Sequence, residues 1–305
     1  MKTCLLIMML LIPLTASAKL YVTIIQGLGG NQAYSKQFDQ ETKDVVQAVT
    51  RITGKDRVSV LTGNQATREQ ILAHFRKLQK TVTRNDRTAL ILIGHGSYDG
   101  RQYKFNIPGP DLTDSDIGGI MKDSPARLQL LVNTSSASGA LLKDLKSDSR
   151  IIITATRNGI ERNATRFGIY FAAALSQHSA DTDKNEAVSA AEAFSYAKQL
   201  TQDYYKNEGR LATEHPQLEG KQADQFTLAR LLPAPKASDN PAMVRLLKQR
   251  RQLDQQIDDL KLRRDEFKTS NEYYNQLQVL LVKMSQLQEQ IDKLNKGLGK
   301  NSNDD

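Results

Sequence analysis

Five short, continuous apolar runs, separated by longer segments, place the strongest constraint on the fold of this chain. They are rich in Leu, Ile and Val and cover residues 20–25, 58–61, 88–93, 128–132 and 151–154. Strands that are apolar along their whole length are typical of parallel sheets buried on both faces. The intervening segments 38–52 and 68–78 have helical spacing of their apolar residues. We therefore predict an α/β fold with a mostly parallel sheet flanked by helices.

A stretch with three prolines, residues 233–241, divides the sequence into two regions. It lacks apolar periodicity and is a predicted linker. Residues 19–232 before it form the predicted α/β domain. Residues 242–296 after it carry apolar residues at the heptad spacing of paired helices, as either one long coiled coil or an antiparallel helical hairpin. We expect few contacts between the two regions, self-association through the coiled coil, and a disordered tail over residues 297–305.

The first eighteen residues have the pattern of a signal peptide. Lys2 is followed by an apolar run from Leu5 to Leu14, and then by the small residues of an Ala16-Ser17-Ala18 cleavage site. The pattern predicts removal of residues 1–18 and export, to a periplasm, of a protein that starts at Lys19. No later run is apolar enough to predict a membrane span. Cys4 is the single cysteine of the chain and would leave with the signal peptide.

The chain is basic, with a formal net charge of +8. A cytoplasmic protein of this charge would be a candidate for binding nucleic acid. For an exported protein we expect no nucleic acid: anionic envelope surfaces or acidic partners are the alternatives, and a solvated basic face that serves no partner is favoured over both.

Polar motifs follow the third and fourth apolar runs. The third leads into Gly94-His95-Gly96-Ser97, and the fourth ends at Asn133 before Thr134-Ser135-Ser136-Ala137-Ser138-Gly139. Ligands of open parallel sheets bind outside the carboxyl ends of the strands. We therefore expect these two motifs to lie together at one edge of the sheet.

The two motifs resemble those of the legumain family of cysteine peptidases, in its bacterial exported branch, which share the caspase-like fold. In that family a His-Gly follows one strand and a Cys-x-Ser-Gly-like turn follows the next. Here Ser136 stands in the cysteine position, or Ser135 if the alignment shifts by one residue. The resemblance covers residues 19–232. It implies that His95 is the catalytic histidine and that the N–H groups of Gly96 and Ser136 hold the oxyanion.

A serine in a cysteine-peptidase frame is chemically demanding. A thiol with a pKa of about 8.5 is partly ionised near neutrality, whereas a serine hydroxyl needs an adjacent base that is itself oriented by a third group. No carboxylate lies at a diagnostic spacing from His95. We therefore predict a catalytically inactive peptidase homologue that acts in recognition of a peptide or protein, or as a scaffold. The alternative is a serine-dependent peptidase or hydrolase that uses Ser136 and His95.

The loop from residue 181 to residue 192 follows the spacing of an EF-hand, and so predicts a Ca²⁺ site. Its ligands would come from the side chains or backbone of six residues. These are Asp181, Asp183, Asn185, Ala187, Ser189 and Glu192. Position six of such a loop is normally glycine, and here it is Glu186. The alternative is a capping box, in which Ser189 and Glu192 satisfy the start of a helix without any metal.

Overall fold

The computed structural model describes residues 18–231 and 240–300. Most of the predicted signal peptide and of the predicted 233–241 linker lies outside the described residues, as does the end of the predicted tail, residues 301–305. No helix in the described part of the chain is both long and apolar enough to cross a membrane.

A six-stranded sheet forms the centre of the protein, in the order β10-β8-β7-β3-β1-β2. Its strands are β1 (Leu20–Gln26), β2 (Val58–Leu61), β3 (Arg87–Ile93), β7 (Leu128–Asn133), β8 (Arg150–Thr154) and β10 (Gln217–Glu219). The first five are mutually parallel, and β10 is antiparallel to β8. These five are the strands predicted from the apolar runs, so the expected α/β class with a mostly parallel sheet is confirmed.

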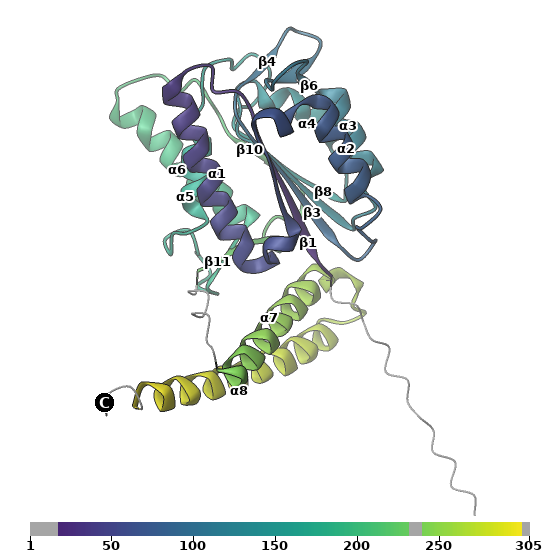
Figure 1. Ribbon diagram of the computed structural model, residues 1–305, viewed down its shortest axis with the longest axis vertical. Helices are drawn as coiled ribbons and strands as arrows, with labels where there is room; N and C mark the ends of the chain where they lie inside the picture. Colours follow the sequence, from purple (N-terminus) through teal and green to yellow (C-terminus); the bar gives the residue numbers. More distant parts are fainter. Residues whose placement is uncertain (1–17, 232–239, 301–305) are drawn as a thin grey trace, which may run out of the picture.

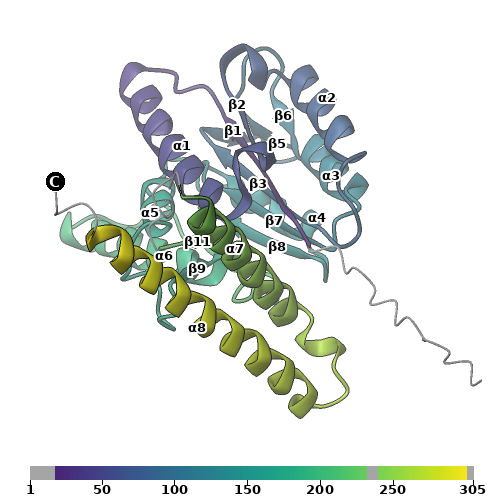
Figure 2. The ribbon, with the colours of Figure 1, turned by 60° about the horizontal axis from the view of Figure 1, so that its bottom comes forward.

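Helices cover both faces of this sheet (Figures 1 and 2). One face packs against α1 (Gln32–Thr53), α5 (Phe167–Ala174) and α6 (Ala190–Asn207). The other packs against α2 (Arg68–Leu78), α3 (Asp114–Asp123) and α4 (Leu142–Leu145). Successive side chains of a strand point to opposite faces, so Ile91 of β3 joins the first layer while Leu90 and Leu92 join the second. This is why the strands are apolar along their length.

Two small antiparallel sheets extend the domain. The strands β4 (Gly96–Tyr98), β5 (Tyr103–Phe105) and β6 (Leu112–Thr113) form a three-stranded sheet that follows β3 directly. The strands β9 (Ala187–Ser189) and β11 (Thr227–Arg230) form a two-stranded sheet. Short 3-10 turns complete the fold: η1 (Lys55–Arg57), η2 (Gly63–Ala66), η3 (Ser138–Leu141) and η4 (Arg264–Glu266).

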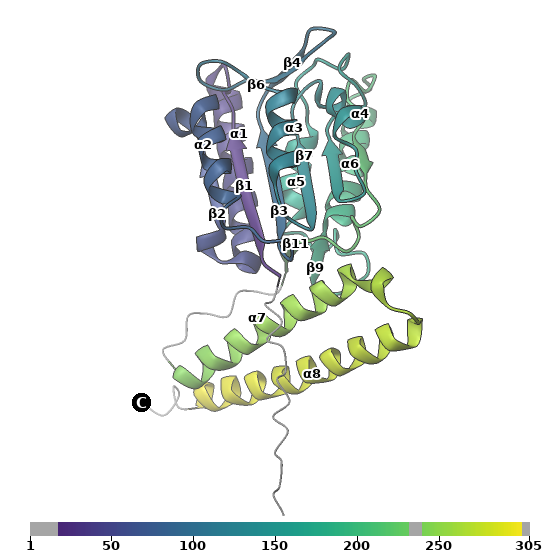
Figure 3. The same ribbon diagram turned by 90° about the vertical axis from the view of Figure 1, so that its right-hand side faces the viewer.

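The C-terminal region forms an antiparallel hairpin of α7 (Pro241–Leu262) and α8 (Ser270–Lys300), rather than one long helix (Figure 3). Thr269 caps α8, because its hydroxyl accepts a hydrogen bond from the N–H of Glu272 at 3.2 Å. Met243, Leu287 and Ile291 form the buried seam between the helices. The last helix reaches Lys300, so residues 297–300, which we assigned to a disordered tail, continue its backbone hydrogen bonding.

The hairpin contacts the α/β domain through a small number of ion pairs and hydrogen bonds. It lies under the amino ends of the strands, at the edge opposite to the carboxyl ends (Figure 3). Asp258 is 3% exposed and receives hydrogen bonds from Arg230 at 3.1 Å and Thr227 at 3.3 Å. Arg127 donates to Glu266. The heptad pattern did not reveal these contacts, because they are made by the polar residues between the apolar ones.

Candidate functional site

The two motifs come together at the carboxyl edge of the sheet, as expected. β3 and β7 are parallel neighbours, with Leu92 paired to Asn133, and the N–H of Thr134 donates to the carbonyl of Leu92 at 3.0 Å. A Cβ atom on Gly96 would lie 2.5 Å from Ser135 Oγ and 2.6 Å from the carbonyl oxygen of Ser136. Glycine at position 96 therefore lets the backbone after His95 pack directly against the serine turn.

His95 is half-buried between the start of α1 and the loop that precedes it. Its Nε2 donates to the carbonyl of Gly29 at 3.3 Å, and its ring meets the rings of Tyr34 and Phe38 nearly edge-on, with centroids 4.6 and 5.0 Å away. Burial lowers the pKa of this imidazole, and the Gly29 carbonyl only partly offsets the effect. His95 is thus a neutral ring near pH 7, fixed by aromatic packing.

Ser136 is only 3% exposed. Within residues 18–231 and 240–300, its hydroxyl takes part in no hydrogen bond, either to His95 or to any other group. A nucleophilic serine needs its base within hydrogen-bond reach, although apo sites can be looser than working ones. The hydroxyl of Ser136 is not paired with a base here.

Ser135, the other candidate for the cysteine position, belongs to a closed buried network. Its Oγ donates to Asn133 Oδ1 at 2.8 Å and lies 2.6 Å from the hydroxyl of Tyr103, which accepts from Asn133 Nδ2 at 2.8 Å. All three residues are fully buried. Burial raises the pKa of the Tyr103 phenol to about 12, despite the opposing effect of its hydrogen bonds to Ser135 and Asn133. Ser135 therefore holds the serine turn in place through buried hydrogen bonds, and its hydroxyl is not available as a nucleophile.

The end of the serine turn is held by the loop that follows β8. Ala137 has a left-handed backbone, with φ of 56°, and its N–H donates to the carbonyl of Glu161 at 2.8 Å. The hydroxyl of Ser138 accepts from the N–H groups of Ala155 and Thr156, at 3.1 and 3.3 Å. Ser138 therefore ties the turn to the residues that follow β8.

A second histidine lies at the same edge. His215 precedes β10, and its Nδ1 donates to Glu161 Oε1 at 2.6 Å. The other carboxylate oxygen, Oε2, accepts from the backbone N–H groups of His215 and Arg157, at 3.0 and 2.9 Å. With Nδ1 protonated, the neutral ring has its lone pair on Nε2. No pattern in the sequence links His215 to Glu161, because the pairing depends on where β10 joins the sheet.

The loops around this edge carry exposed apolar side chains. Leu28 is 48% exposed in the loop after β1, and Ile160 is 78% exposed in the loop after β8. Tyr98 packs so closely on Gly159 that a Cβ there would lie 2.3 Å from its ring. Of the three arginines that follow β8, Arg157 pairs with Glu161 at 3.5 Å, Arg166 stacks on Tyr204, and Arg162 is exposed. The edge therefore exposes two apolar side chains, Leu28 and Ile160, and one exposed arginine, Arg162.

The 181–192 loop brings three carboxylates together. One oxygen from each of Asp181, Asp183 and Glu192 lies within 4.8 Å of the others. Glu186, at position six, has the left-handed φ of 60° that favours glycine there. Position seven, Ala187, begins β9, and Ser189 and Glu192 also form the capping box of α6.

Two carboxyl groups of this loop have pKa values shifted in opposite directions. Burial and the negative charge of Glu192 raise the pKa of Asp183. Burial also opposes ionisation of Glu192, but hydrogen bonds from Ser189 and Thr182 outweigh it and lower its pKa. Two of the carboxylates thus repel each other at neutral pH, which a bound cation would relieve.

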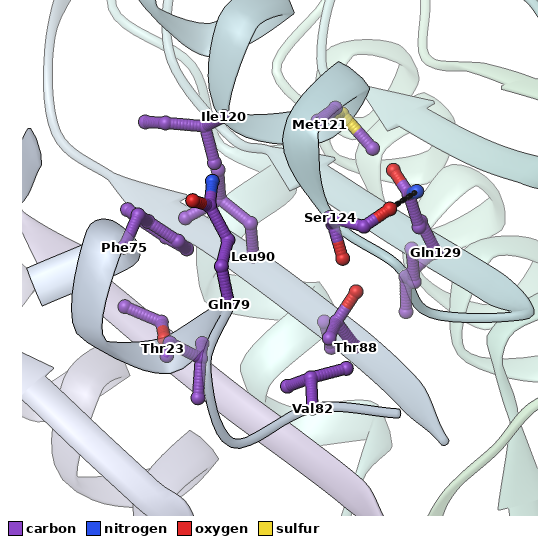
Figure 4. A pocket seen from close by; sticks show the side chains of 13 residues that line it. Thr23, Phe75, Gln79, Val82, Thr88, Leu90, Ile120, Met121, Ser124 and Gln129 are labelled. Carbon is purple, nitrogen blue, oxygen red and sulfur yellow. Dashed lines mark hydrogen bonds between the residues drawn. The ribbon is translucent and has the colours of Figure 1, made fainter. Parts of the chain in front are cut away.

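A cavity between α2, α3 and the sheet is a poor candidate for a site. Its volume is about 30 Å³, enough for one or two water molecules. Figure 4 shows that it is lined mainly by apolar side chains, among them Phe75 and Leu90, with Gln129 bonded to Ser124 at one side. The cavity lies away from His95 and Ser136, near the amino ends of β3 and β7.

No known family model matches the sequence, and no curated protein matches it. Among solved structures, the fold is similar to that of protein GSU0716 from Geobacter sulfurreducens, at 12% sequence identity and a TM-score of 0.46. The similarity covers 70% of this chain and 97% of that one. The chain is thus defined by its architecture: a mixed α/β protein with a mostly parallel sheet and a C-terminal helical hairpin.

Proposed function

We propose that this protein is a catalytically inactive relative of the legumain-like peptidases that recognises a peptide or protein at the carboxyl edge of its sheet. The observation that carries the proposal is that His95 and Ser136 are not hydrogen-bonded to each other. His95 is held by Gly29, Tyr34 and Phe38, while the hydroxyl of Ser136 has no base within hydrogen-bond reach in the described part of the chain. The edge brings the two motifs together but lacks the hydrogen bond that would activate a serine.

Two features support the relationship to legumain-like and caspase-like peptidases. A His-Gly follows β3, and the serine turn follows β7, its parallel neighbour. The loops that frame the turn provide Leu28 and Ile160, whose exposed side chains suit contact with an apolar side chain of a bound peptide. The alternative remains a serine hydrolase, in which ligand binding would have to move His95 or His215 towards Ser136.

Ser136→Ala separates these alternatives. We expect the mature protein to cleave no peptide in a diverse library and to resist labelling by a fluorophosphonate. The variant should keep the wild-type melting temperature to within about 2 °C, because it removes a hydroxyl that has no partner. Ser135→Ala is the matched control: it breaks the buried network with Tyr103 and should lower the melting temperature clearly. Peptide turnover that disappears in Ser136→Ala would establish the hydrolase instead.

We also propose that the 181–192 loop binds Ca²⁺. The convergence of Asp181, Asp183 and Glu192, together with the left-handed backbone at Glu186, supports this assignment. Asn185, Ala187 and Ser189 would complete the set through side-chain or carbonyl oxygens. The capping box of α6 is compatible with it, because Glu192 Oε2 is bonded to Ser189 while Oε1 receives hydrogen bonds only from the loop at Thr182 and Asp183.

Calcium should therefore stabilise the protein by mass action. At a concentration 100 times its dissociation constant, one ion adds about 2.7 kcal/mol, which for a chain of this size raises the melting temperature by several degrees. Asp181→Asn should abolish the rise, whereas Asp148→Asn, at an exposed carboxylate outside the loop, should leave it intact. A melting curve that does not move between chelator and millimolar Ca²⁺ would leave the capping box as the whole role of the loop.

Export to a periplasm and self-association through the hairpin complete the proposal. Export is supported by the signal-peptide pattern of residues 1–18. Self-association is supported by exposed apolar side chains on α8, at Tyr274, Val279, Leu281 and Val282, each about half exposed. In the single chain α7 does not cover them, so a second copy of the hairpin would gain by packing on them.

A further inference from the structure

The amino ends of β1 and β3 meet the hairpin in a buried group of charges. Asp86, just before β3, is 4% exposed, and Arg87 is 2% exposed. Asp259 of α7 lies beside them, with Oδ1 3.9 Å from Arg87 Nη2. Buried charges are costly unless each has a partner. The number of positive charges in this group, relative to the number of negative charges, therefore affects the stability of the folded protein.

The backbone of residues 18 and 19 runs into this group. The N–H of Lys19 donates to Asp86 Oδ1 at 2.9 Å, and the N–H of Ala18 donates to Asp259 Oδ2 at 3.0 Å. The carbonyl of Lys19 accepts from the N–H of Arg87 at 2.7 Å. Lys19 N is therefore fixed in position by bonds on both sides, and its own side chain is exposed.

The charges do not balance while residue 18 is attached. Asp86 and Asp259 carry two negative charges, and Arg87 supplies one positive charge; the further charges that act on Asp259, those of Asp258 and Arg127, are of opposite sign. The nitrogen of Lys19 is then a neutral amide. The acceptor Asp259 Oδ1 is also buried without a hydrogen-bond partner. Burial also raises the pKa of Asp259 to about 6, despite the opposing charge of Arg87.

We propose that this group is a binding site for the chain's own mature N-terminus, the α-ammonium group of Lys19. The inference rests on the proposed export, since hydrolysis of the bond between Ala18 and Lys19 would turn the amide nitrogen into an ammonium without moving the residue. That ammonium would lie within bonding distance of Asp86 and bring a second positive charge to two carboxylates. Its two further N–H donors can serve Asp259, which loses the N–H of Ala18 at the same step.

This site gives removal of the signal peptide a structural consequence. Asp259 belongs to α7, so the new ion pairs join the start of β1 to the hairpin. Docking of the hairpin is then completed only in the processed protein. Lys19 would act through its backbone nitrogen, so the identity of its side chain is not important, but the position of the cleavage is.

The test compares two forms of the mature chain, released from a cleavable fusion partner. One starts at Lys19, and the other carries a single extra glycine that moves the ammonium by about 3.8 Å. We expect the form that starts at Lys19 to melt about 5 °C higher. The difference should vanish in Asp86→Asn and persist in Asp123→Asn, at an exposed carboxylate at the end of α3. Equal melting temperatures, or a difference that survives Asp86→Asn, would overturn the proposal.

Reactivity of the α-amine provides a second measurement that does not require the variant to fold. Bound between carboxylates, the ammonium should react with an acylating reagent at least ~10-fold more slowly than in the same chain unfolded in urea, since a pKa higher by one unit reduces the free amine tenfold. Equal rates would contradict the site. Export is tested separately by the mass of the secreted protein: a mature form that starts elsewhere refutes cleavage after Ala18, whatever the melting comparison gives.

Discussion

Gly139→Ala is expected to destabilise the protein by about 3 kcal/mol or more, which corresponds to a fall in melting temperature of about 10 °C. A Cβ at this position would lie 2.3 Å from both Arg157 C and Asn158 N, and 2.4 Å from the carbonyl oxygen of Thr156. All three are backbone atoms, so no side chain can rotate away. The loop after β8 would have to shift, and with it Glu161, which holds the serine turn through Ala137.

Gly119→Ala is the matched control for this experiment. Gly119 lies inside α3, and nothing lies within 4 Å of the position of its added Cβ. Alanine there should stabilise the protein by about 0.5–1 kcal/mol, because glycine loses more conformational freedom in a helix. Thermal and urea unfolding of both variants measure the contrast. A Gly139→Ala variant as stable as the wild type would mean that the turn and the β8 loop are not packed as described.

Glu41 should make the stability of the domain fall as the pH rises from about 4.5 to about 7. This carboxyl group of α1 is 4% exposed, and one of its oxygens would touch a Cβ placed on Gly168, at 2.6 Å. Burial raises its pKa from 4.5 to about 7, against the effect of its hydrogen bond from Gln37. The folded state therefore binds the proton more tightly than the unfolded state in this range. The full difference amounts to about 3 kcal/mol, lost as the group ionises.

Glu41→Gln should remove this dependence. The variant should be close to the wild type in stability near pH 4.5, and more stable by about 2–3 kcal/mol near pH 8, where the wild type has to bury a charge. Unfolding in urea at a series of pH values provides the measurement, and Glu69→Gln, at an exposed position of α2, provides the control. A stability gain of equal size at both pH values would show that Glu41 does not titrate in this range.

The sequence predicts the part of the fold that burial on two faces dictates. The apolar runs locate β1, β2, β3, β7 and β8 to within one residue at most boundaries, since a strand covered on both sides can contain few polar residues. The short strands β4, β5 and β6 escape prediction. They have only two or three residues each, and they depend on the packing of Phe105 and Leu112 into the core beside α3.

The candidate site is predictable in its location but not in its hydrogen bonds. His95 and Ser136 follow neighbouring strands, so their proximity is a consequence of topology. The roles of Tyr103 and Asn133 cannot be predicted from topology. Tyr103 comes from a short strand and Asn133 from the end of a strand, and neither position has a sequence signature. The distinction between Ser135, locked in their network, and Ser136, which is not, needs side-chain positions. For the same reason, the ion pairs of Asp258 and Asp259 cannot be read from a heptad pattern.

The hairpin and the carboxyl edge lie at opposite ends of the sheet, so the proposed self-association and the proposed recognition would together allow avidity (Figure 3). If copies of the protein associate through α8, every copy still presents Leu28 and Ile160 to solvent. A ligand with repeated motifs, or one displayed at high density on a surface, could then engage several edges at once. The second contact would form at the high effective concentration set by the first. Weak recognition at a single edge would be sufficient for tight attachment of the assembly.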